Sequence, residues 1–141
     1  SLVGSEMCIR DSYQHRGVAK SLLRCYYRMA DVMLVTPFKD GMNLVAKEYV
    51  ACHDDGSGAL VLSEFAGAAD ELNQAYLCNP FDIESVKAAL LNALKALDDA
   101  PSTMTQRMLT MHQQVTEHDV QLWSQSFLGC LRQAEKQEAG A

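Results

Sequence analysis

The sequence predicts an α/β fold, in which a partial parallel sheet with crossover helices is followed by extra helices towards the C-terminus. Two observations support this prediction. Short apolar runs alternate with segments of helical periodicity, an order typical of parallel strands joined by right-handed crossovers. The runs DVMLVTP and ALVLSEF also lack the apolar–polar alternation of a strand with one solvated face. We therefore expect both strands to be buried on both faces.

Composition and charge narrow the classes of function. The 141 residues are 48% hydrophobic, which suffices for one ordinary core. The net charge of −6 disfavours nucleic acid and anionic membrane surfaces as partners. No apolar run approaches the ~20 residues of a membrane span, and no secretory leader is recognised, so we expect a cytoplasmic protein. The five cysteines include no C-x-x-C pair and are expected to be reduced.

The two ends of the chain are expected to lie outside the folded unit. Residues 1–12, SLVGSEMCIRDS, fit no periodicity and resemble translated sequencing-adapter read-through, so we interpret them as a non-native artefact. The folded unit is assigned to residues 13–132. The polar residues 133–141, QAEKQEAGA, are expected to form a disordered tail.

The elements follow from periodicity and stop signals. VAKSLLRCYYRMA predicts an amphipathic helix of about three turns. Its expected apolar side consists of Val18, Leu22, Cys25, Tyr26 and Met29. The first strand, ended by Pro37, leads into a helix over residues 42–52 whose expected apolar side consists of Leu44, Val45, Tyr49 and Cys52. The second strand leads into GAADELNQ, which we expect to be another crossover helix, and AYLCNP predicts a third, shorter strand.

Helices fill the remainder of the sequence. Asp82 is expected to cap a helix over DIESVKAALLNALKAL. The residues of this helix expected to face inward are Ile83, Val86, Leu90, Leu94 and Leu97. TMTQRMLTMHQQVTEHD predicts a further helix after Pro101. A last helix is expected to carry Val120, Trp123, Phe127, Leu128 and Leu131. Three strands are fewer than the five or six usual in an open doubly wound sheet, so we expect further strands upstream.

The junction after the first strand has the most useful chemistry. In open parallel sheets, ligands bind beyond the carboxyl ends of the strands, where helix N-termini present N–H groups. There Asp40 offers a carboxylate, Gly41 lets the backbone approach a ligand, and the N–H groups of residues 42–45 suit a diphosphate. Glu48, one turn beyond Leu44, suits vicinal hydroxyls such as those of ribose. Spacing alone leaves open the alternative that Asp40-Gly41 is a plain turn and Glu48 a solvated side chain.

Other candidates carry less chemistry. Gly67, Ala68 and Ala69 after the second strand suit either close ligand approach or helix–sheet packing. Neither junction is a G-x-G-x-x-G or P-loop motif. His53 is expected to lie in a polar loop and not to bind a metal, because its neighbours Cys52 and Asp54 cannot converge as ligands. Methionines 104, 108 and 111 have helical spacing and are expected to pack in the core.

Two motifs resemble a known family. DGMNLVAKE and SEFAGAA, with similarity from about Tyr13 to the segment HDVQLWSQSFLGCL, closely resemble the C-terminal half of bacterial trehalose-6-phosphate synthases, which are retaining glycosyltransferases of the two-Rossmann-domain (GT-B) type. The resemblance implies a Rossmann-like donor domain and transfer of glucose from UDP-glucose, or another nucleotide-bound glucose, to glucose 6-phosphate. It implies no metal or other cofactor.

The resemblance also implies residue roles. Asp40 would be catalytic and would hold the donor glucose and its diphosphate together with the next three residues, Glu48 would bind the ribose, and the backbone of Val18 would touch the uracil. The residues assigned to the nucleotide sugar are Val18, Asp40, Gly41, Met42, Asn43, Leu44, Val45, Ala46, Lys47 and Glu48.

The chain departs from the family pattern in one major respect. The N-terminal domain that binds the acceptor, and the Arg/Lys pair that neutralises the leaving diphosphate, are missing from this sequence. We therefore expect the chain alone to be inactive and that domain to be its partner. Two alternatives remain open, a glucosylglycerol-phosphate synthase and a non-catalytic sugar-nucleotide-binding homologue. The donor base and assembly of the full-length enzyme into a homo-oligomer are also left open.

Overall fold

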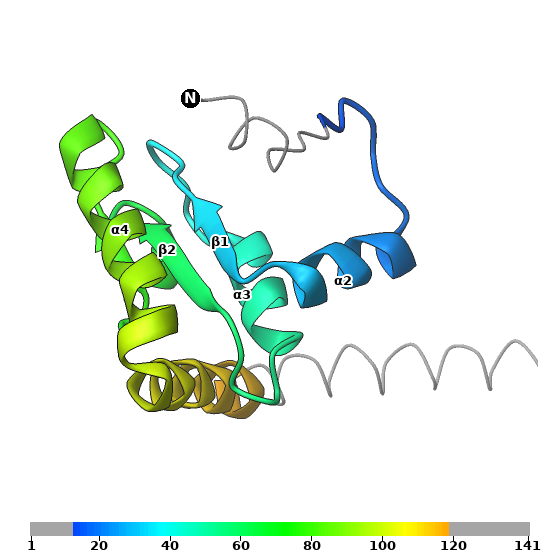
Figure 1. Ribbon diagram of the computed structural model, residues 1–141. Helices are drawn as coiled ribbons and strands as arrows, with labels where there is room; N and C mark the ends of the chain where they lie inside the picture. Colours follow the sequence, from blue (N-terminus) through cyan, green and yellow to red (C-terminus); the bar gives the residue numbers. More distant parts are fainter. Residues whose placement is uncertain (1–12, 119–141) are drawn as a thin grey trace, which may run out of the picture.

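The computed structural model describes residues 13–118 (Figure 1). Three parallel strands alternate with helices, as the sequence predicts. The elements are α2 (Lys20–Met29), β1 (Val32–Val35), α3 (Leu44–Ala51), β2 (Ala59–Ser63), the 3₁₀ turn η1 (Gly67–Ala69), β3 (Tyr76–Cys78) and α4 (Ile83–Asp99), followed by a helical segment over residues 101–118. The artefact, the last helix and the tail predicted from the sequence lie outside the described residues.

The sheet has the order β1-β2-β3 with both pairs parallel, which confirms the predicted α/β class. Every residue of β2 is buried, because β2 has a strand on each side and helices over both faces. The prediction of two-sided burial is wrong for β1, where Leu34 is 45% exposed. Among residues 13–118, β1 pairs only with β2 and is an edge strand.

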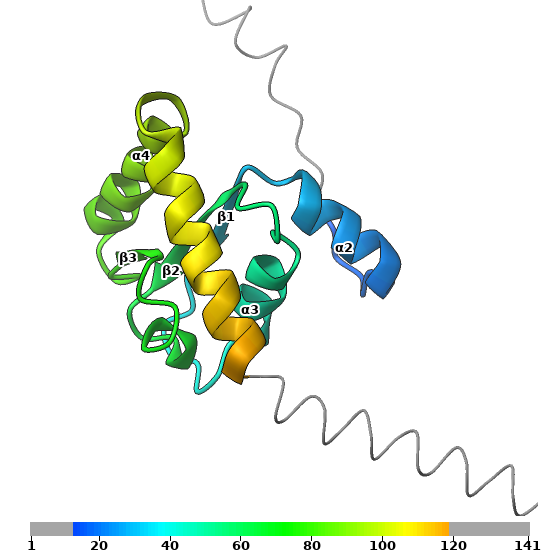
Figure 2. The ribbon, with the colours of Figure 1, turned by 90° about the horizontal axis from the view of Figure 1, so that it is seen from below.

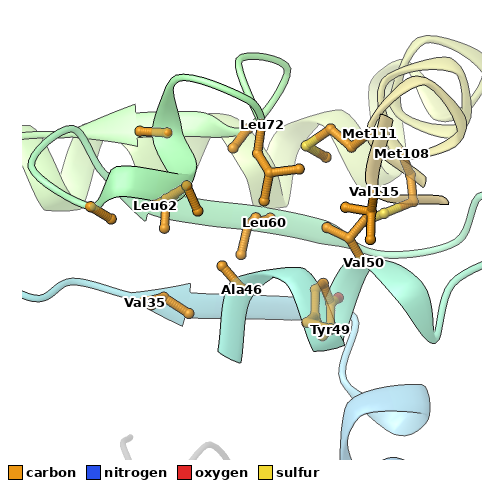
Figure 3. Close-up of a cluster of buried hydrophobic side chains, with 14 of the residues drawn as sticks. Val35, Ala46, Tyr49, Val50, Leu60, Leu62, Leu72, Met108, Met111 and Val115 are labelled. Atoms are coloured by element: carbon orange, nitrogen blue, oxygen red, sulfur yellow. The ribbon is translucent and has the colours of Figure 1, made fainter. Parts of the chain in front are cut away.

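Two apolar clusters lie on opposite faces of the sheet. Leu60 and Leu62 of β2 point to one face, where they meet α3 and the later turns of helix 101–118 (Figure 3). The alternate β2 residues, Ala59 and Val61, belong to the second cluster with α4. This alternation follows from the two-residue period of a strand. It places α3 and α4 on opposite sides of β2.

Helix 101–118 crosses the sheet region between α3 and α4 (Figure 2). Its buried side chains include Met104, which packs in the α4 cluster, and Met108 and Met111, which pack in the α3 cluster. The prediction that these methionines pack in the core is therefore confirmed. Thioether side chains suit this position because they adapt to irregular gaps where two clusters meet.

The predicted apolar side of α2 is wrong. Met29 is 77% exposed and Leu22 is 48% exposed, whereas Tyr27 is buried and Leu23 packs against the same core. Two apolar rows run along this helix one residue apart, with the same spacing of four and then three residues. Periodicity cannot choose between such rows, and Val18 lies before the helix begins.

Three further expectations require correction. GAADELNQ forms only the three-residue turn η1 and then a loop, with Leu72 completely buried. In α4, which Asp82 does cap, Ile83 is 75% exposed and Leu94 is 43% exposed, and the fully covered positions are alanines. At the start of α3, Leu44 is 57% exposed. Ile83 and Leu44 are the first residues of their helices, and both side chains are exposed among the described residues.

His53 lies in the loop that follows α3, as predicted, and its side chain is completely buried. Its Nδ1 lies 2.7 Å from the carbonyl oxygen of Tyr49, and its ring packs on the Tyr49 ring with centroids 4.2 Å apart. Gly58, with φ of 83°, passes so close that an added Cβ would lie 2.5 Å from the Tyr49 hydroxyl. The polar sequence HDDGSG therefore forms a compact closure over the end of α3.

Candidate functional site

The site begins where the chain leaves the carboxyl ends of β1 and β2. Asp40 forms an isolated parallel bridge with Ala66 beyond the strand ends. The N–H of Gly67 donates to the carbonyl of Asp40 at 2.7 Å, and the N–H of Asp40 donates to the carbonyl of Phe65 at 3.4 Å. The two junctions identified in the sequence are thus joined into one edge.

Asp40 organises its own loop. Its Oδ1 accepts the N–H groups of Met42 and Asn43, each at 3.1 Å, and its Oδ2 accepts the Asn43 side-chain amide at 3.0 Å. These bonds explain why α3 begins at Leu44 and not at the predicted residue 42. They also occupy two of the N–H groups that the sequence assigned to a diphosphate.

Asn43 sets the N-terminus of α3. Its backbone is left-handed, with φ of 59°, and its side-chain oxygen accepts the N–H of Ala46 at 3.0 Å. No described acceptor takes the N–H groups of Leu44 and Val45. These two donors lie at the positive end of the helix dipole, an arrangement that favours an anion.

Val18 and Glu48, which are 30 positions apart, line one cavity of about 590 Å³. Val18 lies just before α2, and Glu48 lies in the second turn of α3. The full lining is Val18, Lys20, Leu23, Arg24, Tyr27, Glu48, Ala51 and Cys52. The structure therefore brings together the two residues that the resemblance assigned to uracil and ribose.

Glu48 has one described partner, the hydroxyl of Tyr27, which donates to its Oε2 at 3.2 Å. Burial and the neighbouring carboxylate raise the pKa of Tyr27 to about 12, so this hydroxyl stays protonated at neutral pH. Tyr27 meets Tyr49 edge to face, with ring centroids 6.3 Å apart, and the Tyr49 hydroxyl donates to the carbonyl of Ala30 at 2.8 Å.

The other assigned residues occupy varied environments. Gly41 has open space where a Cβ would stand, whereas Gly67 faces the Gly41 backbone. Ala46 is completely buried. The Lys47 ammonium lies 2.8 Å from Glu71 Oε2, and its side chain is only 12% exposed. The side chains of Ala46 and Lys47 thus contact the protein and not the cavity, and their assignment to the nucleotide sugar stays a prediction.

Residue patterns alone missed three polar residues of the cavity: Lys20, Arg24 and Tyr27. All three come from α2, whose contact side was predicted incorrectly. The sequence does contain a pattern for the correct contact side, because Leu23 and Tyr27 are four residues apart and share a face of the helix. The second apolar row, one residue earlier, has the same spacing, so the pattern alone does not identify the buried face. The choice of helix face therefore decides which residues enter the site.

A larger groove of about 870 Å³ flanks the cavity and shares Arg24, Ala51 and Cys52 with it. Within it the Arg28 guanidinium lies 2.7 Å from Asp54, and this pair lowers the pKa of the Asp54 carboxyl. The groove contains neither Val18 nor Glu48, the two residues that the resemblance assigned to the nucleoside. Its size therefore does not make it the candidate site.

The fold and this edge define a parallel α/β domain whose candidate ligand site lies at the carboxyl ends of its strands. The chain belongs to glycosyltransferase family 20, whose model matches residues 12–133. It is 52% identical over 127 residues to the trehalose-6-phosphate synthase of Mycobacterium leprae, covering 90% of this chain and 25% of that protein. It is 55% identical over 126 residues to that of Mycolicibacterium vanbaalenii, covering 89% and 25%.

Solved structures agree with these relatives. A structure from E. coli bound with UDP-2-fluoro glucose has a TM-score of 0.72 and 43% identity, covering 86% of this chain and 26% of that chain. An α,α-trehalose-phosphate synthase from Burkholderia xenovorans in complex with glucose-6-phosphate also has a TM-score of 0.72 and 43% identity, covering 85% and 26%. The chain thus spans about a quarter of the length of these relatives. The predicted family and its GT-B-type fold are confirmed.

Residues 13–118 contain neither a metal-binding cluster nor a membrane-spanning helix. No group of three His, Cys, Asp or Glu side chains is arranged there to hold a metal ion. No helix in the same range is long and apolar enough to cross a bilayer.

Proposed function

We propose that this chain is the donor-binding part of a trehalose-6-phosphate synthase, which transfers glucose from UDP-glucose to glucose 6-phosphate with retention at the anomeric carbon. Membership of glycosyltransferase family 20 and the identity of the relatives support this proposal. The two ligands named for the E. coli and Burkholderia structures are of the matching chemical classes. The relatives do not favour the glucosylglycerol-phosphate alternative.

One observation carries the proposal: the cavity that holds Val18 and Glu48 lies one helical turn from the unpaired N–H groups of α3. Four residues of α-helix rise about 6 Å, which is the step from a ribose to the diphosphate attached to it. A nucleoside in the cavity, with its ribose hydroxyls on Glu48, would place the diphosphate at Leu44 and Val45. The spacing along α3 therefore suits a nucleoside diphosphate.

The loop residues take the remaining roles in this proposal. Asp40 holds the loop through three hydrogen bonds from Met42 and Asn43 and still has an acceptor position on Oδ2 for a donor hydroxyl, since a carboxylate offers about four such positions. It is the residue that we assign to the reacting glucose. Gly41 leaves open the space beside it. A ligand can therefore approach the backbone at this position.

The proposal needs a second domain for the acceptor and for the cationic residues that neutralise the leaving diphosphate. We expect this domain to come from the remaining length that the relatives possess, and the 141-residue chain alone to form no product. We propose a metal-independent reaction in the cytoplasm. The described cysteines Cys25, Cys52 and Cys78 are free thiols, which suits a reducing compartment.

Titration of the isotope-labelled 141-residue chain with UDP-glucose, followed by amide chemical shifts, tests the proposal. We expect weak binding, with the largest shifts at Val18, Leu44, Val45 and Glu48. Glu48→Gln should weaken binding, because a neutral amide accepts hydroxyl protons less strongly than a carboxylate. The control Glu84→Gln, on the exposed surface of α4, should leave binding unchanged. Shifts centred elsewhere, or none at saturating ligand, would contradict the proposed site.

In the full-length enzyme, the same Glu48→Gln substitution should raise the KM for the nucleotide sugar, because it removes a ribose contact. An unchanged KM would exclude the assigned role of Glu48. Trehalose 6-phosphate formation by the isolated chain would show that no second domain is needed.

A further inference from the structure

Glu48 is an exposed glutamate with only one described partner. Its side chain has three rotatable bonds, and fixing them costs conformational entropy. A freely rotating carboxylate would therefore bind a diol poorly, because part of the binding free energy would be consumed in ordering it. The contact from Tyr27 reduces this cost before any ligand arrives.

The Tyr27 ring is held in place by the buried core. It is 6% exposed and belongs to the apolar cluster with Tyr49, whose ring it meets at an interplanar angle of 87°. Tyr49 is completely buried and is tied through its hydroxyl to the carbonyl of Ala30. Two packed tyrosine rings thus connect the core beside the sheet to the Glu48 carboxylate, which the Tyr27 hydroxyl contacts.

We propose that Tyr27 is a positioning residue for the donor nucleoside, which holds Glu48 Oε2 and leaves Oε1 directed to the two ribose hydroxyls. This inference rests on the proposed function, because it requires a ribose in the cavity. The direction of the hydrogen bond is fixed, since an ionised carboxylate can only accept. Tyr27 lines the same cavity as Val18 and Glu48. It therefore acts through Glu48 and does not replace it.

The experiment compares UDP with 2′,3′-dideoxy-UDP, which lacks both ribose hydroxyls, as ligands of the full 141-residue chain. The variants are Tyr27→Phe, Glu48→Gln and the double variant. Tyr26→Phe, on the neighbouring exposed position of α2, is the matched control. Dissociation constants from calorimetry or amide shifts give the ratio of the two affinities for each protein, and circular dichroism verifies that each variant is folded.

We expect the original chain and Tyr26→Phe to prefer UDP, and Tyr27→Phe to lower that preference roughly 3- to 10-fold. Glu48→Gln should reduce the preference further, and adding Tyr27→Phe to it should change nothing more. An unchanged ratio in Tyr27→Phe, whether both affinities stay the same or fall equally, would show that Tyr27 does not act on the ribose contact. This outcome would overturn the inference while leaving the proposed function intact. Absence of any UDP preference in the original chain would refute the ribose assignment, and with it both proposals.

Discussion

Gly67 lies directly against the backbone of Gly41, so that a Cβ added to Gly67 would stand 2.1 Å from the Gly41 carbonyl oxygen. The contact joins the two junctions that follow β1 and β2. Because the obstructing atoms belong to the backbone, a small rotamer change cannot relieve the clash. The absence of a side chain at Gly67 is therefore a structural requirement of the edge that carries the candidate site.

Gly67→Ala should lower the free energy of unfolding by about 2–3 kcal/mol, because the two junctions must move apart to admit the methyl group. Chemical denaturation of the 141-residue chain measures this change. Gly17→Ala is the control, since nothing lies within 4 Å of the corresponding Cβ. Equal stability of the two variants would show that the junctions separate freely.

Gly41→Ala should leave stability unchanged and weaken ligand binding. Nothing lies within 4 Å of its Cβ position, so stability should stay within about 0.5 kcal/mol of the original. The new methyl group would occupy the space through which the donor approaches the backbone, so UDP-glucose affinity should fall by about tenfold. Calorimetric titration measures the affinity. Normal affinity would place the donor away from this loop.

Asn43 combines a cap with a left-handed backbone, and two substitutions separate these contributions. Asn43→Gly suits the left-handed backbone and removes the side-chain bonds to Ala46 and Asp40, of which the lost bond to Asp40 accounts for most of a cost of about 1 kcal/mol. Asn43→Ala removes the same bonds but keeps a Cβ on the left-handed backbone, so it should be about 1–2 kcal/mol less stable than the glycine variant. Urea denaturation should rank the alanine variant as the less stable. The reverse order would mean that φ at this position relaxes without cost.

Stability should fall at alkaline pH. Burial, together with Glu48, raises the pKa of Tyr27 to about 12, and burial also raises the pKa of Tyr49. A raised pKa means that the folded state holds the proton more tightly, so the contribution is complete below the ordinary value of about 10 and is lost as pH rises above it. Each such tyrosine should lower the free energy of unfolding by about 1.4 kcal/mol per pH unit between the two pKa values.

Denaturation of the original chain and Tyr27→Phe at intervals from pH 8 to 11 tests this dependence. The variant should lose stability less steeply above pH 10, because it has one buried hydroxyl fewer to ionise. Identical slopes would show that Tyr27 ionises equally in both states.

The strands could be predicted because apolar runs bounded by Pro and Gly leave few alternatives for a parallel sheet. The site loop was predictable in position, but its internal bonding was not. The left-handed backbone of Asn43 and the closure by Asp40 depend on side-chain geometry that spacing does not encode. Spacing alone therefore predicts that all the N–H groups of residues 42–45 are free. In the structure only those of Leu44 and Val45 have no described acceptor.

Burial was harder to predict than element type. On α2, two apolar rows with equal spacing compete, and only the position of α3 decides in favour of Leu23 and Tyr27. The polar neighbours of His53 indicate a loop but not its burial, which arises because the tight turn at Gly58 folds the chain over it. Contacts between segments far apart in the sequence determine which of these side chains are buried, and a single sequence does not reveal those contacts.

Oxidation of the three core methionines of helix 101–118 can report when this helix separates from the sheet. Met108 is completely buried, and Met104 and Met111 are 6% and 2% exposed, so peroxide reaches their sulfur atoms only when the helix leaves the sheet. Met29 and Met42, at 77% and 58% exposure, provide fast-reacting internal standards in the same chain. Sulfoxide formation read by mass spectrometry should therefore be slow at the first three sites and quicken as denaturant is added, which measures how firmly one helix holds the two cores together.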